Sequence, residues 1–350
     1  MNLNIALLGF GNVGRALADL LLAKQDTLRD EYGMVVRVVG IGTGRHGHAV
    51  DLSGISLRTA LDAVRFGTML DGLHEGRQIT DTWNFLERCP ADLVFESMPT
   101  NPLDGQPALD HIRSLLERGI HVVTANKGPV AFGYHELKAL AAGKNVGFFF
   151  ESTVMDGAPV LGVGREGLAG SDISEIRGIF NSTTNYILTR MEQDNLNFEE
   201  AVKMAQEIGI AEADPTLDID GWDSAIKTVI LANVLMGTDL RPADVTREGI
   251  RDITLDDVQA ARIAGQRIKL VCEAIRQPDG SISAQVGPRR LPLSDLFASI
   301  TDATSVVDYY TDALPHLTII EHNPSPITTA YGMLVDMINI VRGRYESGAA

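Results

Sequence analysis

The first residues of the chain constrain its fold more than any other part. The apolar run from Leu3 to Gly9 fits a buried parallel strand, and it leads into GFGNVG and an amphipathic helix over about Val13 to Ala23. A G-x-G-x-x-G motif placed between a strand and a helix is typical of a dinucleotide-binding α/β fold. The first glycine makes the tight turn, the second lets the backbone approach a pyrophosphate, and the third lets helix pack on strand. The alternative is a glycine-rich turn without a ligand. The dinucleotide-binding residues predicted here are Gly9, Phe10, Gly11, Asn12, Val13 and Gly14.

The end of the second predicted strand bears on the choice of cofactor. An NAD-selective site usually places Asp or Glu there, where it bonds the ribose 2′-hydroxyl. Here the strand Val35 to Ile41 is followed by GTGRHG, with no acidic residue before Asp51. Arg45 in this segment suits a 2′-phosphate, which favours NADP, with NAD or dual use as the other possibility. The alternative is that Arg45 is a solvated loop residue.

Two later strands place further residues at the same crevice. The strand Ala91 to Glu96 runs into SMPTNP, and the strand Ile120 to Thr124 runs into ANKGP. Loops at the carboxyl ends of parallel strands line the ligand crevice of such a sheet. We therefore expect Met98, Pro99 and Thr100 to lie along the cofactor and Lys127, at a strand tip, to face the same crevice. Position alone leaves open whether Lys127 is functional.

An acidic stretch, GIAEADPTLDIDGWDSAIK at positions 209–227, dominates the second half of the chain. Pro215 and Gly221 interrupt any helix up to that point, and the run after Gly221 has helical spacing. Asp223 and Lys227 then stand at i and i+4 on one helix face. They are either an exposed helix ion pair or a partly buried lysine beside carboxylates, which is a natural proton carrier. The carboxylates of the stretch are Glu212, Asp214, Asp218, Asp220 and Asp223.

Two polar turns precede other helices of the second half. In ESTVMDGAP at 151–159, carboxylates and backbone carbonyls could hold a hard cation. The alternative is that Asp156 or Ser152 caps the following helix. In NSTTN at 181–185, side-chain donors and acceptors are expected to cap a helix over Tyr186 to Glu192.

Composition excludes several classes of protein. A length of 350 residues suggests about two domains, and the segment 129–134 is the predicted domain crossing. The net charge of -16 argues against nucleic acid or an anionic membrane as a partner. Two cysteines, Cys89 and Cys272, fit a reducing compartment. No signal peptide precedes the first strand and no apolar run reaches the roughly 18 residues that span a bilayer, so we expect a cytoplasmic protein.

Taken together, five motifs resemble those of the homoserine dehydrogenases. They are GFGNVG, TANKGP, ESTVMDGAPV, IFNSTTNYIL and GIAEADP with DIDGWDSAIK, in the same order and spacing, and REGI, IKL and TAYGMLVD extend the match over nearly the whole chain. The resemblance implies an α/β protein with an N-terminal Rossmann domain at 1–132, a mixed α/β substrate and dimerisation domain at 133–325, and a final helix at 326–345 that returns to the first domain. It also implies a homodimer and NAD(P)-dependent interconversion of L-homoserine and L-aspartate 4-semialdehyde, a step in threonine, methionine and isoleucine biosynthesis.

The same resemblance implies roles for individual residues. Lys227 is the proton donor and acceptor on the substrate oxygen, and Lys127 bridges nicotinamide and substrate. Glu212, Asp218 and Asp223 hold the substrate amino group or orient Lys227. Asn181 and Thr183 belong to the substrate loop. The positions that hold a monovalent cation, Na⁺ or K⁺, match Glu151, Val154, Asp156 and Ala158.

The chain departs from the family pattern in three places. Ser182 stands where glycine is frequent, and Asn323-Pro324-Ser325-Pro326 replaces a Gly-Ala-Gly turn, which affects a cofactor contact. A chain that stops at Ala350 leaves no room for a C-terminal amino-acid-sensing domain, so we expect no threonine inhibition through a distinct site. Two other functions stay open: a related dehydrogenase of another hydroxy acid or semialdehyde, and a non-catalytic NADP-sensing protein. Both lysines and the key acids are retained, which weighs against the latter.

Overall fold

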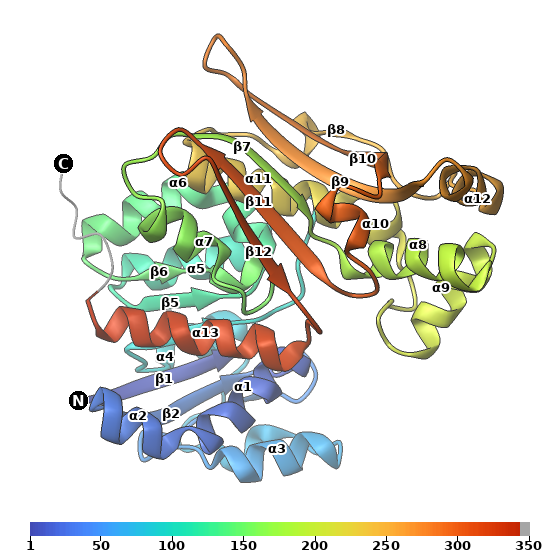
Figure 1. The fold of residues 1–350 in the computed structure, drawn as a ribbon. Coiled ribbons are helices and arrows are strands. Elements are labelled where there is room, and N and C mark those ends of the chain that lie inside the picture. The colour runs from blue at the N-terminus through green and yellow to red at the C-terminus, as the bar shows by residue number, and fades with distance from the viewer. Residues whose placement is uncertain (344–350) are drawn as a thin grey trace. The chain divides into compact units, whose positions relative to one another are not determined.

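The computed structural model describes residues 1–343, which divide into two compact units (Figure 1). The first unit comprises Met1–Gly157 and the chain from Ser325 onward, and the second comprises Ala158–Pro324. The crossing predicted at 129–134 and the boundary at 132 differ from this division. The reason is helix α6, Lys127–Lys144, which runs through the predicted crossing. Pro129 is compatible with α6 because it lies in the first turn, where backbone N–H groups have no intrahelical acceptor.

The first unit is built on a six-stranded sheet in the order β3-β2-β1-β4-β5-β6. All neighbours are parallel except β2 and β3. The strand order reverses at β1, whose neighbours are β2 and β4, and ligands of such sheets bind beyond the carboxyl ends at this point. The strands are β1 Asn2–Leu8, β2 Val35–Gly42, β3 His48–Val50, β4 Leu93–Glu96, β5 His121–Thr124 and β6 Phe148–Phe149.

The helices of the first unit cover this sheet and include the last helix of the chain. Helix α13, Pro326–Val341, packs on α1 and β5, and Met333 and Met337 share a buried cluster with Leu17 (Figure 1). Ser325 caps α13 and Pro326 occupies its first turn. Positions 344 and 345 of the predicted final helix lie outside the described residues. The other helices are α1 Asn12–Ala23, α2 Gln25–Tyr32, α3 Leu57–Arg65, η1 Leu70–Leu73, α4 Thr82–Arg88, α5 Ala108–Glu117 and η2 Glu151–Thr153.

The second unit has its own six-stranded sheet in the order β12-β11-β7-β9-β10-β8. Its pairs are antiparallel except for β8 and β10. Buried Ile179, Val271 and Val306 form a small core with Phe297 of the 3₁₀ turn η5, Leu296–Ser299. The strands are β7 Ile173–Ile179, β8 Thr246–Arg247, β9 Gln266–Arg276, β10 Ile282–Pro292, β11 Ser305–Thr311 and β12 His316–Glu321.

Helix α11, Trp222–Met236, is the central helix of the second unit. It contacts β7, β9 and β10, and it is buried on nearly all sides, from Ser224 to Asn233. A helix that is apolar all round is a core helix rather than a surface one. The remaining helical segments are α7 Val160–Gly162, η3 Val163–Gly167, α8 Ser182–Asp194, α9 Phe198–Glu207, α10 Thr216–Ile219, η4 Pro242–Asp244 and α12 Leu255–Ile263.

These observations confirm the predicted α/β class, with a Rossmann-type sheet in the first unit and a mixed sheet in the second. The helix predicted over Tyr186 to Glu192 begins earlier, at Ser182, because Asn181 caps it. No helix in residues 1–343 is both long enough and apolar enough to span a bilayer.

Candidate functional site

The glycine-rich turn after β1 has the geometry that a pyrophosphate site requires. Gly9 adopts φ +103°, and a Cβ on Gly14 would lie 2.2 Å from the Gly9 carbonyl oxygen, so α1 packs directly on the turn. Gly11 is exposed, and a Cβ there would meet no atom within 4 Å. Gly11 also forms the N-cap of α1 without a side-chain cap. The first N–H groups of α1 therefore have no side-chain acceptor and can bind an anion.

Arg45 lies in the loop beyond the carboxyl end of β2, and the last residue of β2 is bonded to this turn. Leu8 pairs with Gly42, and the Gly9 N–H donates to the Gly42 oxygen at 2.9 Å, so the two strand ends are held together. Arg45 is exposed and makes no hydrogen bond or ion pair with residues 1–343. Its guanidinium is therefore free to meet an anionic group.

The ends of β4 and β5 are joined by a buried acid that the sequence analysis missed. Glu96, fully buried, is paired with Thr124, and its carboxylate accepts from the Thr124 hydroxyl at 2.5 Å and from the Met98 N–H at 2.8 Å. It also accepts from the Asn126 side chain at 3.3 Å. The available signal was one charged residue at the end of an otherwise apolar strand. Glu96 thus connects the segment 97–100 to the turn that begins α6.

Lys127 lies in that turn as the first residue of α6, rather than at a strand tip. Asn126 is the N-cap, and its side-chain oxygen accepts from the Gly128 N–H at 3.1 Å. Asn126 therefore fixes the start of α6 with one end of its amide and contacts Glu96 with the other. Met98 and Thr100 are half-buried and Pro99 is exposed.

The buried carboxyl group makes stability depend on pH. Burial raises the pKa of Glu96 from its ordinary value of 4.5 to about 7. Between these values the folded protein binds more protons than the unfolded chain, so stability falls as pH rises. We expect wild type to lose on the order of 3 kcal/mol relative to Glu96→Gln between pH 4.5 and 7. Urea unfolding of both proteins at pH 5 and pH 8 measures this change, and a pH-independent difference would contradict it.

In the second unit, one amide joins two of the predicted acids. The Asn181 side-chain nitrogen donates to Asp218 at 2.6 Å and to Asp223 at 3.0 Å. Its side-chain oxygen accepts from the Thr184 N–H at 2.8 Å and so caps α8. Asn181 is 5% exposed. The cap fixes the amide, and the amide fixes both carboxylates.

Lys227 completes this group, which we call the lysine–carboxylate cluster: Asn181, Asp218, Asp223 and Lys227. The Lys227 amine lies 3.1 Å from Asp223 and donates to the Phe180 carbonyl at 2.6 Å. Both charged side chains of the pair are only 14% exposed. An exposed helix ion pair is therefore the wrong interpretation, and the partly buried one is confirmed. The Phe180 carbonyl was not anticipated, since a backbone acceptor leaves no signal in side-chain chemistry.

Asp220, in the same acidic stretch, has partners outside this cluster. Gly221 caps α11 in a left-handed conformation, with φ +79°. The Arg247 guanidinium stacks 3.8 Å from the Trp222 ring centroid and donates to the Asp220 carbonyl. The Asp220 carboxylate pairs with Arg251 at 2.8 Å. Neighbouring acids of one short segment thus have different partners.

Two predicted substrate residues lie outside the cluster's hydrogen bonds. The buried Thr183 hydroxyl donates to the Ile210 carbonyl at 3.2 Å. Glu212 is exposed, and its carboxylate makes no hydrogen bond or ion pair with residues 1–343. Glu212 follows α9, where its backbone oxygen accepts from Gln206. Their roles toward a substrate stay predictions.

The predicted cation residues span the boundary of the two units in the chain. Glu151, Val154 and Asp156 belong to the first unit, and Ala158 begins the second. The Asp156 carboxylate accepts from the Thr329 hydroxyl at 2.9 Å, and the N-cap of α7 is Pro159, which provides no side-chain cap. Asp156 and Ser152 are therefore not caps of that helix. Within residues 1–343, no group of three or more His, Cys, Asp or Glu side chains could hold a metal ion.

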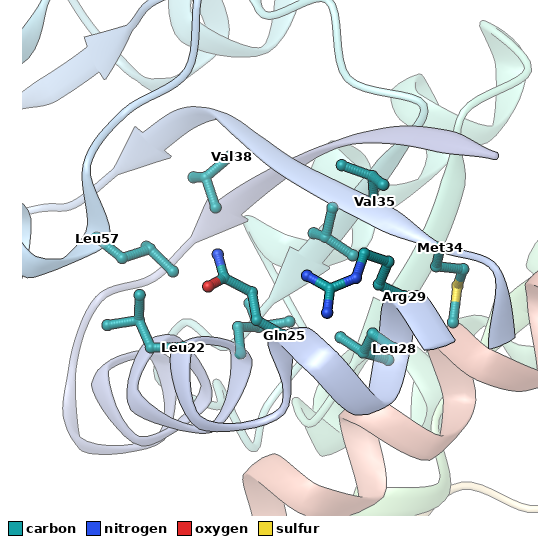
Figure 2. Close-up of a pocket in the computed structure, with 10 residues that line it drawn as sticks. Leu22, Gln25, Leu28, Arg29, Met34, Val35, Val38 and Leu57 are labelled. Atoms are coloured by element: carbon teal, nitrogen blue, oxygen red, sulfur yellow. The ribbon is translucent and has the colours of Figure 1, made fainter. Parts of the chain in front are cut away.

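Two hollows in the first unit differ in their relation to the predicted site. A cavity of about 260 Å³ lies between α2 and β2, where Figure 2 shows Gln25 and Arg29 among apolar side chains. It contains no predicted site residue. A more open groove of about 820 Å³ includes Asn12 of the glycine-rich turn. The residues that line the first cavity are Leu21, Leu22, Gln25, Leu28, Arg29, Met34, Val35, Val36, Val38 and Leu57.

Family models match both halves of the chain. A model described as the NAD-binding domain of homoserine dehydrogenase matches residues 9–151, and one described as homoserine dehydrogenase matches residues 159–338. The first matched region lies within the first unit, and the second covers the second unit and continues into α13 of the first.

Named relatives and solved structures agree with these models over nearly the full chain. An NAD(+)-dependent homoserine dehydrogenase of Pseudomonas canavaninivorans is 41% identical over 344 residues, covering 96% of this chain and 95% of the relative. A homoserine dehydrogenase of Methanocaldococcus jannaschii is 38% identical, covering 97% and 98%. A hyperthermophilic archaeal homoserine dehydrogenase in complex with NADPH superimposes with a TM-score of 0.83 at 30% identity, covering 98% of both chains. The crystal structure of a homoserine dehydrogenase from Thiobacillus denitrificans superimposes with a TM-score of 0.83 at 31% identity, covering 98% of this chain and 74% of that one.

Proposed function

Because the chain belongs to the homoserine dehydrogenase family, we propose that it interconverts L-homoserine and L-aspartate 4-semialdehyde with NAD(P). Members of this family are oxidoreductases, and the nucleotide-binding model covers the unit that carries the glycine-rich turn. The observation that supports the reaction best is the lysine–carboxylate cluster, which offers a partly buried amine beside two acids. This cluster supplies the two groups that an amino alcohol requires, a base for its hydroxyl and an anion for its ammonium.

The chemistry at Lys227 follows from its two acceptors. When homoserine is oxidised, a hydride leaves the carbon that bears the primary alcohol for the nicotinamide, and the O–H proton must leave as well. A neutral Lys227 amine has two N–H groups, which match the Phe180 carbonyl and Asp223. Its lone pair is then free to accept the alcohol proton, and the ammonium returns that proton to the aldehyde oxygen in the reverse reaction. Asp223 stabilises the ammonium form.

The second acid of the cluster fits the substrate amino group. Asp218 and Asp223 both accept from Asn181, so one neutral donor lies between two carboxylates. With Lys227 charged, the cluster retains one net negative charge, which favours binding of an ammonium group. We assign Asp218 to the substrate ammonium and Asp223 to the orientation of Lys227, with Thr183 and Glu212 as further substrate residues. Lys127 is proposed to contact both nicotinamide and substrate.

The proposed cofactor preference is NADP, and it depends on Arg45. The exposed, unpaired guanidinium in the loop that follows β2 suits a 2′-phosphate. Replacing Arg45 with Ala is expected to raise KM for NADP about 10-fold while leaving KM for NAD within about twofold, because only NADP loses a charge-assisted contact. Initial rates with each cofactor measure the ratio. Equal changes for NAD and NADP would mean that Arg45 does not contact the phosphate.

Three further features are proposed from the family. A homodimer would have twice the protomer mass of 37.8 kDa in light scattering after gel filtration, and a single protomer mass would reject it.

Glu151, Val154, Asp156 and Ala158 offer an all-oxygen donor set, which suits Na⁺ or K⁺. Activity that is the same in Na⁺, K⁺ and tetramethylammonium buffers would reject a functional cation. Cytoplasmic localisation is proposed with the biosynthetic role, and recovery of the protein in a secreted fraction would contradict it.

Substrate comparison tests the proposed function directly. Initial rates of NAD(P) reduction should be measured with homoserine, malate, glycerate and threonine at matched concentrations. Homoserine is expected to give the highest kcat/KM because it combines a primary alcohol with an ammonium group. A preference for malate or glycerate, which lack the ammonium, would reject the assignment and favour a hydroxy-acid dehydrogenase.

A further inference from the structure

Glu96 is a buried acid that the proposed reaction does not use. It is 0% exposed at the last position of β4, where the sheet meets the predicted cofactor crevice. Three donors converge on its carboxylate: the Met98 N–H, the Thr124 hydroxyl and the Asn126 side chain. Met98 and Asn126 lie in the segments that follow β4 and β5, and Thr124 is the last residue of β5. The carboxylate therefore joins parts of the chain that are far apart in sequence.

We propose that Glu96 is a positioning residue, whose ionised carboxylate holds the segment 97–100 and the Asn126–Lys127 turn in the arrangement that binds the nicotinamide cofactor. This inference rests on the proposed function, because that function places the cofactor at the carboxyl ends of these strands. The same Asn126 amide also lies 3.5 Å from the Pro99 carbonyl, so the two segments meet at one side chain. Loss of the carboxylate would release both segments together.

The choice of residue favours positioning over simple stabilisation of the sheet. A buried carboxylate is costly unless it is paired or hydrogen-bonded, so its partners indicate why an acid is present here. All three partners are donors, so only a group that accepts at both oxygens satisfies them together. Thr124 already accepts from the Asn126 N–H at 2.9 Å, which directs its own hydroxyl proton toward Glu96. A neutral group at this position would oppose one of these donors.

Several ionisable side chains lie in the elements around Glu96. Its strand pairs with β1 and β5, and α5, α13 and η2 contact β5. Lys127 and His121 lie in the segments nearest to the strand ends and in β5, and the elements that contact β5 carry the buried His111, Asp336 and Glu151. Burial lowers the pKa of His121. Protonation of Glu96, whose pKa burial raises to about 7, would convert one acceptor oxygen into a donor. Cofactor binding is therefore expected to weaken as pH falls.

Binding of NADH, followed by its fluorescence, tests this inference without turnover. NADH is the appropriate probe because it lacks the 2′-phosphate of NADPH, which titrates near pH 6 by analogy with other phosphomonoesters. In wild type the Kd should rise about 5- to 10-fold from pH 8.5 to pH 6, and in Glu96→Gln it should be high and constant. Thr124→Val removes one donor to Glu96 together with the acceptor of the Asn126 N–H, and it should give about a threefold rise in Kd at pH 8.5. This variant keeps the test open if Glu96→Gln fails to fold. Asp92→Asn is the matched control, since this carboxylate accepts from the Asn4 N–H at 2.8 Å before β4 begins.

The outcomes separate this inference from the proposed function. A wild-type pH dependence that is lost in Glu96→Gln and kept in Asp92→Asn supports the positioning role. If Glu96→Gln and Thr124→Val bind NADH as wild type does at every pH, the role is overturned, even where unfolding shows lower stability. Absence of homoserine oxidation together with this pH pattern would reject the substrate assignment and leave the role of Glu96 supported. Failure of wild type to bind either NADH or NADPH would overturn both.

Discussion

Replacing Lys227 with Ala is expected to lower kcat for homoserine oxidation by about 10³- to 10⁴-fold, with little change in the Kd for NADPH. The amine is proposed to remove the alcohol proton as the hydride departs, and a positioned acid or base typically contributes rate factors of about this size. Lys227 belongs to the second unit, whereas the glycine-rich turn belongs to the first, so cofactor affinity should be retained. Stopped-flow absorbance at 340 nm gives kcat, and NADPH fluorescence gives the Kd.

A second lysine variant controls for the loss of one positive charge. Lys203→Ala deletes a lysine of α9 that is 76% exposed and 3.8 Å from Glu207, and its kcat should stay within about twofold of wild type. Added ethylamine should partly restore Lys227→Ala, because a small amine can enter the space that the side chain leaves. If Lys227→Ala turns over at a rate close to wild type, the proton passes to another group, and the mechanism proposed for the cluster is wrong. A non-catalytic NADP-sensing protein would show no turnover in either variant or in wild type.

The glycine-rich turn and the pair Asp223 and Lys227 of the cluster could both be predicted from residues that are close together in the sequence. The turn at positions 9–14 is specified by residues that are adjacent in the chain, since positive φ at Gly9 and close packing at Gly14 both require glycine. The pair Asp223 and Lys227 follows from the helical period, and the structure places the two groups 3.1 Å apart. Their burial was less certain from sequence, because it depends on the strands that α11 packs against.

Contacts between distant segments could not be derived from the sequence pattern. Asn181 and Asp218 are separated by α8, α9 and a loop, and the family resemblance placed both at the substrate site without predicting the hydrogen bond between them. Glu96 was missed because a single acid at a strand end usually faces solvent, whereas this one is fully buried beneath the following segments. The crossing near 129–134 was misplaced because Gly128, Pro129 and Gly133 together resemble a break. In the structure, Gly133 instead allows close packing, since a Cβ there would lie 2.4 Å from Leu109.

Replacing Asp223 with Asn is expected to lower kcat/KM for homoserine roughly 100-fold, the second largest effect in the protein. An amide keeps the shape of the carboxylate, but it removes the charge that faces both Asn181 and Lys227. The ammonium form of Lys227 then loses its charged partner, so kcat falls, and the site also loses attraction for the substrate ammonium, so KM rises. Steady-state rates over a range of homoserine concentrations separate the two effects. The Kd for NADPH should be unchanged.

Asp220 provides the control that makes this result specific, because it lies three residues away in the same acidic stretch. Its carboxylate pairs with Arg251 at 2.8 Å and not with Lys227, so Asp220→Asn should reduce kcat/KM by no more than about threefold. Similar losses in both variants would show that the overall negative charge of the stretch matters, rather than the contact between Asp223 and Lys227. A large loss in Asp223→Asn alone requires a mechanism in which one carboxylate orients one amine, because the two variants differ in partner and not in charge.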